Sequence, residues 1–454
     1  MKFKIFLILL FLSSLFTFIK SEEKVIFAWQ MHRHGARAPF EGVINGSDAY
    51  KEKWIKKEEL SQVGKRMLYL LGVKIRKKYI EKLNLLSQKY NPQEIYIRST
   101  DVNRTIESIE SFLQGLYPPG TGPIINEKIR NEINITYPPN SEYHKQFKEI
   151  INKYNLSEDG AALPYKMSFE PIHLFYIPKH EFKLYDTKIC KGHKEKYEEQ
   201  KNSKKFHDFG DELNQKFGDL FFKLENTENI TFLYDYWTIY KYMDAFICDE
   251  TDAREFDYLL KNFNFNQTMF ELLRKYAKEY LWLDYTYTNY PEGYDNISIV
   301  ANSYTFHSIV NWMENAIEGS KKNKTYLKYV IFSAHDSSIG ALEYFMKYAF
   351  GTEVDYSVFA ESRYLELYLD DKNEYRVRYL RGNNSEKKNL PFNDFKKTIN
   401  EKTWTDEKVA EFCQFEDNQK LKEEKTNVWY IVFIFLVFLN VILILIIMIV
   451  CLKK

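Results

Sequence analysis

Short apolar runs alternate with amphipathic helical stretches along the chain, and this alternation constrains the fold more than any other feature. The first run, residues 25–29, is rich in β-branched and aromatic side chains and predicts a buried strand. Residues 59–80 carry apolar side chains at spacings of three and four, with Ser61 near the start, and predict a helix. Residues 95–97 predict a strand and residues 103–116 another helix. This order predicts an α/β layer structure.

The same alternation returns near the end of the chain. Residues 304–317 predict a helix, residues 329–332 a strand and residues 338–348 a helix. Two further strands at 364–369 and 375–379, joined by a polar turn, predict a hairpin. The sheet is therefore expected to resume after an interruption.

The interruption covers residues 120–302, where the periodic pattern loosens. It contains Pro-bearing loops, charged stretches such as 191–205, and apolar helical pieces near 213–224 and 258–283. We interpret it as a largely helical insertion between two parts of one α/β core, residues 22–119 and 303–415.

Both ends of the chain predict membrane targeting. A basic start followed by a short apolar stretch predicts a signal peptide over residues 1–21, with cleavage near Ser21. Residues 428–452 are almost entirely apolar and long enough to span a bilayer, preceded by a stalk at 416–427. The tail 453–454 is basic, which favours a cytoplasmic end and a single-pass type I protein. A glycolipid-anchor signal is the alternative, but the stalk lacks the small residues that it requires.

Asn-x-Ser/Thr sequons suit a glycosylated lumenal or extracellular domain between those ends. The candidates for glycosylation are Asn45, Asn134, Asn155, Asn229, Asn266, Asn296, Asn323 and Asn383. Asn103 forms a ninth sequon. We expect it to carry no glycan, because a glycan there would collide with the core.

Charge and cysteine content exclude several classes of partner. The formal net charge is +1, from 64 basic and 63 acidic residues, so no global field would recruit nucleic acid. Cys451 lies in the predicted membrane segment, and the other three cysteines cannot all pair internally. No cysteine or histidine spacing suggests zinc, so we expect no metal and no cofactor.

Chemically active side chains follow three of the predicted strands. Arg33, His34 and Arg37 come after the first strand, Arg98 after the second, and the pair His335-Asp336 after residues 329–332. If these strands are neighbours, their carboxyl ends meet at the edge where open α/β sheets bind ligands, and Gly35 would let the backbone approach one.

Guanidinium groups match the geometry of a tetrahedral oxyanion, so this set predicts a phosphate site. A neutral imidazole can attack phosphorus, which makes His34 the candidate nucleophile. Taken alone, the basic run would be a solvated face and His335-Asp336 an ordinary turn. Because both motifs occur in one chain, each just after a predicted strand, the phosphate site is the favoured interpretation.

These residues resemble the histidine acid phosphatases, and among them most closely the prostatic and lysosomal enzymes. The likeness rests on the family's Arg-His-Gly-x-Arg-x-Pro motif and on four further segments. They are Arg33-His34-Gly35-Ala36-Arg37-Ala38-Pro39, Glu59-Leu60-Ser61-Gln62-Val63-Gly64, residues 98–105, Pro171-Ile172-His173 and Ser333-Ala334-His335-Asp336.

The resemblance implies a mixed β-sheet core flanked by helices, an inserted helical cap over the site, and metal-independent hydrolysis of small phosphate monoesters through a phosphohistidine. His34 would be the nucleophile and Asp336 the proton donor to the leaving group. The phosphate ligands would be Arg33, Arg37, Arg98 and His335. It also implies a disulfide between Cys190 and Cys413, which leaves Cys248 as a thiol.

Three departures from the family pattern bear on this reading. The segment 117–164 is longer than expected, Asn103 stands where the family commonly has aspartate, and Cys248 lacks its usual partner near residues 361–363. A phytase or inositol-polyphosphate phosphatase and a non-catalytic glycosylated ectodomain remain as alternatives. The sequence also leaves open whether the protein is a monomer or a homodimer, and whether it resides in lysosome-like compartments or at the cell surface.

Overall fold

The structure is a computed structural model that describes residues 23–39, 58–122, 190–228 and 296–414, apart from 356, 383 and 384, with a few short pieces between 149 and 276. Within these residues no helix has the length and apolar character needed to cross a bilayer. The expected signal peptide and membrane segment lie outside the described residues, so both stay predictions.

One seven-stranded sheet forms the centre of the molecule, in the order β3-β2-β4-β1-β5-β6-β7. The strands are β1 (Lys24–Arg33), β2 (Ile95–Ser99), β3 (Phe175–Tyr176), β4 (Tyr329–Ala334), β5 (Ser362–Leu369), β6 (Tyr375–Arg381) and β7 (Glu386–Pro391). The first four pair in parallel, and β5 to β7 join in antiparallel order. The sheet is therefore mixed, and β5 and β6 form the predicted hairpin.

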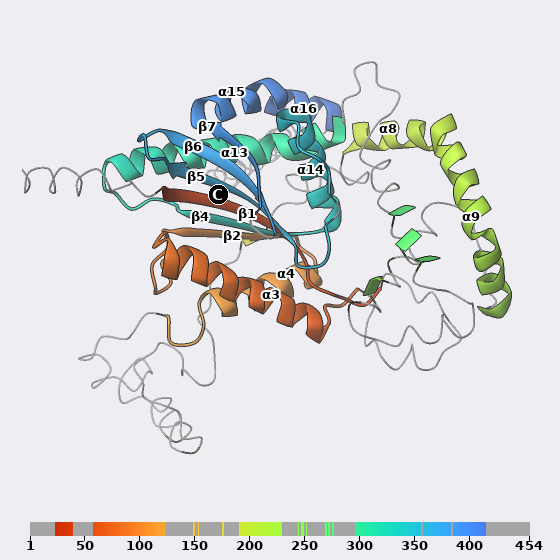
Figure 1. The fold of residues 1–454 in the computed structure, drawn as a ribbon, viewed down its shortest axis with the longest axis horizontal. Coiled ribbons are helices and arrows are strands. Elements are labelled where there is room, and N and C mark those ends of the chain that lie inside the picture. Colours follow the sequence, from red (N-terminus) through yellow and green to blue (C-terminus); the bar gives the residue numbers. More distant parts are fainter. Residues whose placement is uncertain are drawn as a thin grey trace, which may run out of the picture.

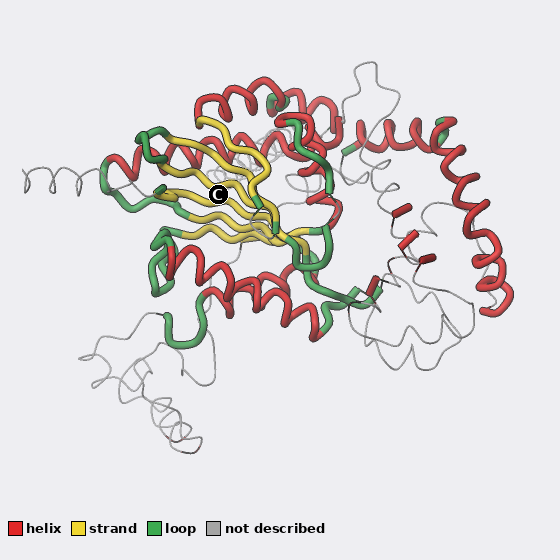
Figure 2. Tube along the Cα trace, in the orientation of Figure 1, coloured by secondary structure: helices red, strands yellow, loops and turns green. Residues whose placement is uncertain are grey.

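Helices cover both faces of this sheet, as Figures 1 and 2 show. The helices are α3 (Gln62–Ile75), the π-helix η1 (Arg76–Lys82), α4 (Asn103–Leu116), α8 (Lys191–Lys201), α9 (Lys204–Glu228), α13 (Asn296–Lys321), α14 (Asp336–Phe350), α15 (Phe392–Lys402) and α16 (Asp406–Cys413). Helices α3 and α4 lie on one face, and α13, α14 and α15 on the other. Helices α8 and α9, from the insertion, lie beside this α/β core (Figure 1).

The two faces of the sheet explain the apolar runs in the sequence. In β1, every residue after Lys24 is buried, because alternate side chains enter two different cores. Trp29 packs with Phe332 in the core beneath α13 and α14, whereas Ala28 packs in the core beneath α3 and α4. A strand buried on both faces has no polar alternation, which is why residues 25–29 appear continuously apolar.

Several elements extend beyond their predicted bounds. Ser61 caps α3 by accepting a hydrogen bond from the Gly64 amide at 3.1 Å, and the helix continues as η1 instead of ending at residue 80. Helix α13 begins at Asn296 and runs through the expected boundary at residue 302. The charged stretch 191–205 is helical, as α8 and the start of α9.

A disulfide joins Cys190 to Cys413, as the resemblance implied. It links the residue before α8 to the last residue of α16, so it ties the insertion to the end of the core. Val300 and Val409 pack around it in a small buried cluster. Cys248 is a buried thiol, also as expected.

Two sequons can be placed on the fold. Asn323 is exposed just after α13, compatible with a glycan. Asn103 is also exposed, at the first residue of α4, so the expected collision with the core is wrong. Asn296 begins α13, and the other candidates lie outside the described residues.

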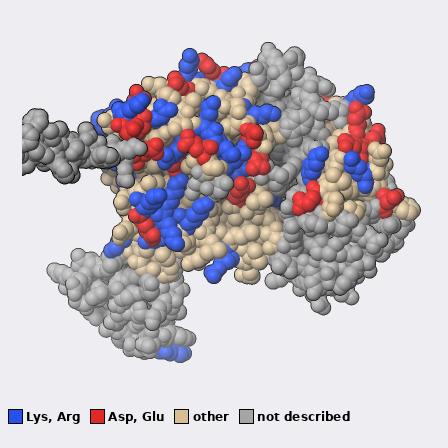
Figure 3. Space-filling view, in the orientation of Figure 1, with Lys and Arg blue, Asp and Glu red and all other residues tan. Residues whose placement is uncertain are grey.

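Acidic and basic side chains are interspersed over the described face in Figure 3. This mixing agrees with the formal net charge of +1. Attraction of an anion therefore depends on the local arrangement of charged side chains and not on the field of the whole protein.

Candidate active site

The carboxyl ends of β2, β4 and β1 meet at the centre of the sheet. These strands are direct neighbours, with Arg33 of β1 opposite Ala334 of β4. The His34 amide donates to the Ala334 carbonyl at 2.9 Å, and the Thr100 amide donates to the Ser333 carbonyl at 3.2 Å. The convergence expected from the sequence is confirmed for these three chain segments.

A close approach of two glycines fixes the segment after β1. A Cβ on Gly35 would lie 2.4 Å from the Gly64 carbonyl oxygen, and one on Gly64 would lie 2.1 Å from the Ala36 oxygen. Gly35 therefore permits the close contact with the start of α3. Its expected role in the approach of a ligand stays a prediction. This contact places Arg37 beside the amino end of α3, where it pairs with Leu60 in a β-bridge.

His34 is buried, and its hydrogen bonding defines its tautomer. Its Nδ1 lies 2.8 Å from the Gly35 carbonyl oxygen, which can only accept, so in the neutral ring Nδ1 carries the proton. Burial lowers the pKa of His34 well below its usual value, and the positive charges of Arg104, Arg37 and Arg33 lower it further. His34 is thus a neutral imidazole whose Nε2 bears the lone pair.

Arg33, the last residue of β1, pairs with Asp336. Its Nη2 forms an ion pair with Asp336 Oδ2 at 2.7 Å, and both groups are largely buried. Its Nη1 donates to the Ser357 carbonyl at 2.7 Å, and its guanidinium carbon lies 4.2 Å from the centre of the Phe359 ring. These contacts with Asp336, Ser357 and Phe359 fix the orientation of the guanidinium group.

Asp336 starts helix α14 and is ionised in this arrangement. Burial favours the neutral acid, but the charges of Arg33 and Arg37 outweigh burial and lower the pKa of Asp336 to about 2. Its Oδ1 also accepts from the Ser337 amide at 2.8 Å. Asp336 can therefore act as a proton donor only after it has received a proton from another group.

Arg37 forms a two-point ion pair with a residue of the insertion that sequence analysis missed. Its Nη1 and Nη2 donate to the Asp244 carboxylate at 3.0 and 2.8 Å, and both side chains are buried. Its Nη1 also lies 3.8 Å from the Cys248 sulfur. Nothing in the sequence around Asp244 distinguished it from the many other acidic residues of the insertion.

His335 lies beside His34, with their ring centres 5.7 Å apart. Its Nδ1 lies 3.3 Å from Nη2 of Arg104, which can only donate, so in the neutral ring Nε2 carries the proton toward Thr100 Oγ1 at 2.9 Å. His335 is therefore oriented by two partners from the β2–α4 segment.

Arg98 does not join this cluster, contrary to expectation. It lies within β2, its guanidinium over the rings of Phe332 and Tyr96 at 5.1 and 5.8 Å, on the face that carries α13. Strand periodicity explains this, since Arg98 shares the face of Tyr96, two residues earlier.

Arg104 occupies the position that we assigned to Arg98. It is buried in the first turn of α4, contacts His335, and pairs with Glu58 at 2.6 Å. The available signal was its place just after the end of β2, within the segment 98–105 that carried the resemblance.

Each of the three site arginines pairs with a carboxylate in this structure. The pairs are Arg33 with Asp336, Arg37 with Asp244 and Arg104 with Glu58. Three guanidinium groups beside two imidazoles have the charge and the donor geometry to bind a multiply charged oxyanion. The described residues contain no cluster of three or more His, Cys, Asp or Glu that could hold a metal ion, and the metal expectation stays a prediction.

Comparison with known families agrees with this geometry. A sequence model of the histidine phosphatase superfamily (branch 2) matches residues 24–381. The chain belongs to this family. Lysosomal acid phosphatase of Xenopus laevis is 25% identical over 374 residues, covering 80% of the chain and 71% of that relative. Putative acid phosphatase 11 of Caenorhabditis elegans is 39% identical over 111 residues, 24% of the chain and about a quarter (26%) of that relative.

Solved structures show the same fold. The phytase of Citrobacter braakii aligns with a TM-score of 0.53 at 12% identity, covering 86% of the chain and 99% of the phytase. Hafnia alvei phytase in complex with myo-inositol hexakis sulphate aligns with a TM-score of 0.52 at 12% identity, over 87% and 100%. At this identity the likeness concerns the fold alone.

Proposed function

We propose that this member of the histidine phosphatase superfamily is an acid phosphatase that hydrolyses small phosphate monoesters through a phosphohistidine on His34. The single observation that carries the proposal is the state of the His34 ring. Its Nδ1 is bound to the Gly35 carbonyl, and its lone pair on Nε2 lies among three buried arginines. A neutral nucleophile surrounded by positive charge suits attack on an anionic phosphoryl group.

In the first step, Nε2 of His34 bonds to phosphorus while the bond from phosphorus to the ester oxygen breaks. Arg33, Arg37 and Arg104 would hold the phosphoryl oxygens. His335 would donate to one of them when its Nε2–H turns from Thr100 Oγ1 to the phosphoryl group. Asp336 would pass a proton to the departing alkoxide. In the second step water attacks the phosphohistidine, Asp336 takes a proton from that water, and the bond from phosphorus to nitrogen breaks.

The proton on Asp336 explains why activity should require acid. With a pKa of about 2, Asp336 is ionised at the pH of any cellular compartment. A phosphate monoester has a second pKa of about 6, so below that pH it arrives as a monoanion with one proton. An incoming phosphoryl group also competes for Arg33, which weakens the ion pair that keeps Asp336 ionised. Substrate binding can thus transfer the proton that Asp336 needs.

The test compares two esters across pH with the full chain in detergent. We expect hydrolysis to rise as pH falls through about 6. Asp336→Asn should slow an alkyl phosphate far more than an activated aryl phosphate, whose leaving group needs little protonation. Asp371→Asn, in the exposed hairpin turn, is the matched control. Equal slowing of both esters, with phosphoenzyme formation limiting for each, would remove Asp336 from this role.

The proposed setting is a membrane-anchored, glycosylated domain in a lysosome-like or extracellular compartment. The Cys190–Cys413 disulfide and the lysosomal relative support the secretory pathway. The non-catalytic alternative predicts no phosphate release from any ester at any pH, so the same assay decides between them.

A further inference from the structure

A short loop before β5 contacts both the nucleophile segment and Arg33. We call residues 357–361 the Phe359 loop. The Ser357 carbonyl accepts from Arg33 Nη1 at 2.7 Å, and the Phe359 ring lies under the guanidinium. The Ala360 amide donates to the His34 carbonyl at 3.0 Å. The loop therefore supports the side chain of Arg33 and the backbone of His34 together.

The loop is held in an unfavourable backbone conformation. Ala360 has φ of +59°, in the left-handed region. For a residue with a Cβ this region is unfavourable, so surrounding contacts must hold it in place.

Glu361 supplies those contacts. Its Oε2 accepts from the Val358 amide at 3.1 Å, and its backbone amide donates to the Val358 carbonyl at 3.2 Å, which closes the loop on itself. Its Oε1 lies 3.0 Å from Nη1 of Arg363. The Glu361 carbonyl accepts from the Arg33 amide at 2.9 Å.

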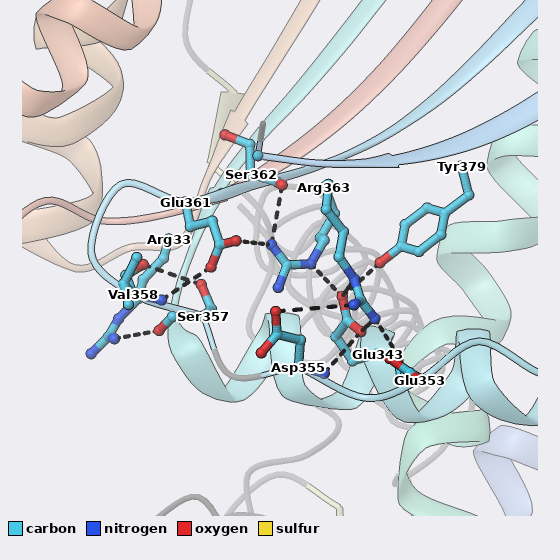
Figure 4. Close-up of polar contacts among 12 residues, drawn as sticks. Arg33, Glu343, Glu353, Asp355, Ser357, Val358, Glu361, Ser362, Arg363 and Tyr379 are labelled. Carbon is cyan, nitrogen blue, oxygen red and sulfur yellow. Dashed lines mark hydrogen bonds and ion pairs between the residues drawn. The ribbon is translucent and has the colours of Figure 1, made fainter. Parts of the chain in front are cut away.

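Behind Glu361 lies a buried ionic cluster, drawn in Figure 4. Arg363 and Glu343 are both fully buried and form an ion pair. Glu343 also accepts a hydrogen bond from the Tyr379 hydroxyl at 2.7 Å and forms an ion pair with the guanidinium of Arg381. The cluster ties β5 and β6 to α14, the helix that begins with Asp336.

We propose that Glu361 is a positioning residue for the phosphate site. Its side chain is held by Arg363 and in turn holds the Phe359 loop, and the loop orients Arg33. This inference rests on the proposed function. Arginine is long and flexible, so binding a phosphoryl group with Nη atoms in place requires that its other contacts stay fixed. Glu361 itself does not reach the phosphate.

The test is Glu361→Ala, read through phosphate affinity as well as turnover. We expect the KM for an aryl phosphate and the inhibition constant of inorganic phosphate to rise about tenfold, because misplacement of a binding group weakens both. Glu361→Gln should recover part of the loss, since its amide oxygen can still accept from Val358. Asp355→Asn is the control, because that carboxylate is half exposed and lies 4.0 Å from Arg381.

A double-mutant cycle distinguishes positioning from general destabilisation. In an Arg33→Ala background, Glu361→Ala should change phosphate affinity less than twofold, because its effect passes through Arg33. An unchanged affinity in the single variant, or the same tenfold loss in the Arg33→Ala background, would overturn the proposal. Calorimetric titration with inorganic phosphate reads affinity without turnover. A wild type that binds phosphate but releases none from esters would contradict the proposed function and leave this test intact.

Discussion

His32 and His34 lie at the carboxyl end of β1, and burial keeps both rings neutral. The two rings have different roles. His34 faces the arginines, whereas His32 stacks on Phe112 beneath α4 and its Nδ1 lies 3.1 Å from the Arg33 carbonyl oxygen. Burial lowers the pKa of His32 to about 4. One imidazole is thus available for chemistry, and the other packs in the core.

The neutral state of His32 makes the fold sensitive to acid. In the unfolded chain this imidazole takes up a proton near pH 6.5, whereas the folded chain resists it until about pH 4. Stability from this residue is therefore complete above the unfolded pKa and falls as pH drops from about 6.5 to about 4, by about 3 kcal/mol in total. His32→Asn, which keeps a donor near the Nδ1 position, should remove that pH dependence.

Urea unfolding at pH 7 and pH 4 measures this effect. The wild type should lose about 3 kcal/mol more than His32→Asn between the two pH values. His207→Asn, at an exposed site on α9, should behave as the wild type. Parallel losses in the wild type and the His32 variant would refute the assignment.

Arg104 and Arg98 give a second prediction at the residue scale. Arg104→Ala should raise the KM for phosphate monoesters and lower kcat/KM by about a hundredfold, because it removes a buried cation from the site. Arg98→Ala should change kcat/KM by less than about threefold, since its guanidinium lies over Phe332 on the sheet face. Steady-state kinetics of the two variants test this assignment. A larger loss of kcat/KM in Arg98→Ala than in Arg104→Ala would place Arg98 in the site instead.

At the scale of elements, the junction between β1 and α3 depends on the absence of two side chains. The backbones of Gly35 and Gly64 approach so closely that a Cβ on either would clash with main-chain atoms of the other segment. Main-chain atoms cannot rotate away as a side chain can. This junction fixes both the His34 segment and the Arg37 segment.

Gly64→Ala should therefore destabilise the fold by about 2 kcal/mol or more and reduce activity at temperatures where the chain stays folded. Gly218→Ala on α9 is the matched control, because its nearest neighbour is the flexible side chain of Asn214. That control should be neutral or stabilising by up to about 1 kcal/mol. Thermal unfolding of both variants provides the comparison, and equal midpoints would show that the junction tolerates a Cβ.

Helices and strands could be predicted from the sequence where burial produces a regular pattern of apolar side chains. The helix 103–116 and the β5–β6 hairpin were expected with nearly the observed bounds, because the helix buries one apolar face and the strands carry continuous runs of buried side chains. Strand β7 was not predicted, since it lies at the sheet edge and consists of Glu, Lys, Lys, Asn, Leu and Pro. The pairing of Arg37 with Asp244 could not be predicted either, because it joins residues 207 positions apart in the sequence.

At the scale of the whole molecule, one disulfide closes a very long loop. Cys190 and Cys413 are separated by 223 residues, and the chain-entropy model assigns about 5 kcal/mol to a loop of that length. The double variant Cys190→Ser with Cys413→Ser should unfold at a markedly lower temperature. Wild type under reducing conditions should match the variant, and an unchanged midpoint would show that the bridge does not support the fold.

The central claim is that His34 carries the phosphoryl group during turnover. Rapid alkaline quenching of the full-length protein during turnover of a radioactive phosphate ester, followed by peptide mapping at alkaline pH, tests it most directly. We predict an alkali-stable, acid-labile label on the peptide that contains His34, and complete loss of both label and turnover in His34→Ala. A label that maps to another residue, or near-normal turnover in His34→Ala, would contradict the account.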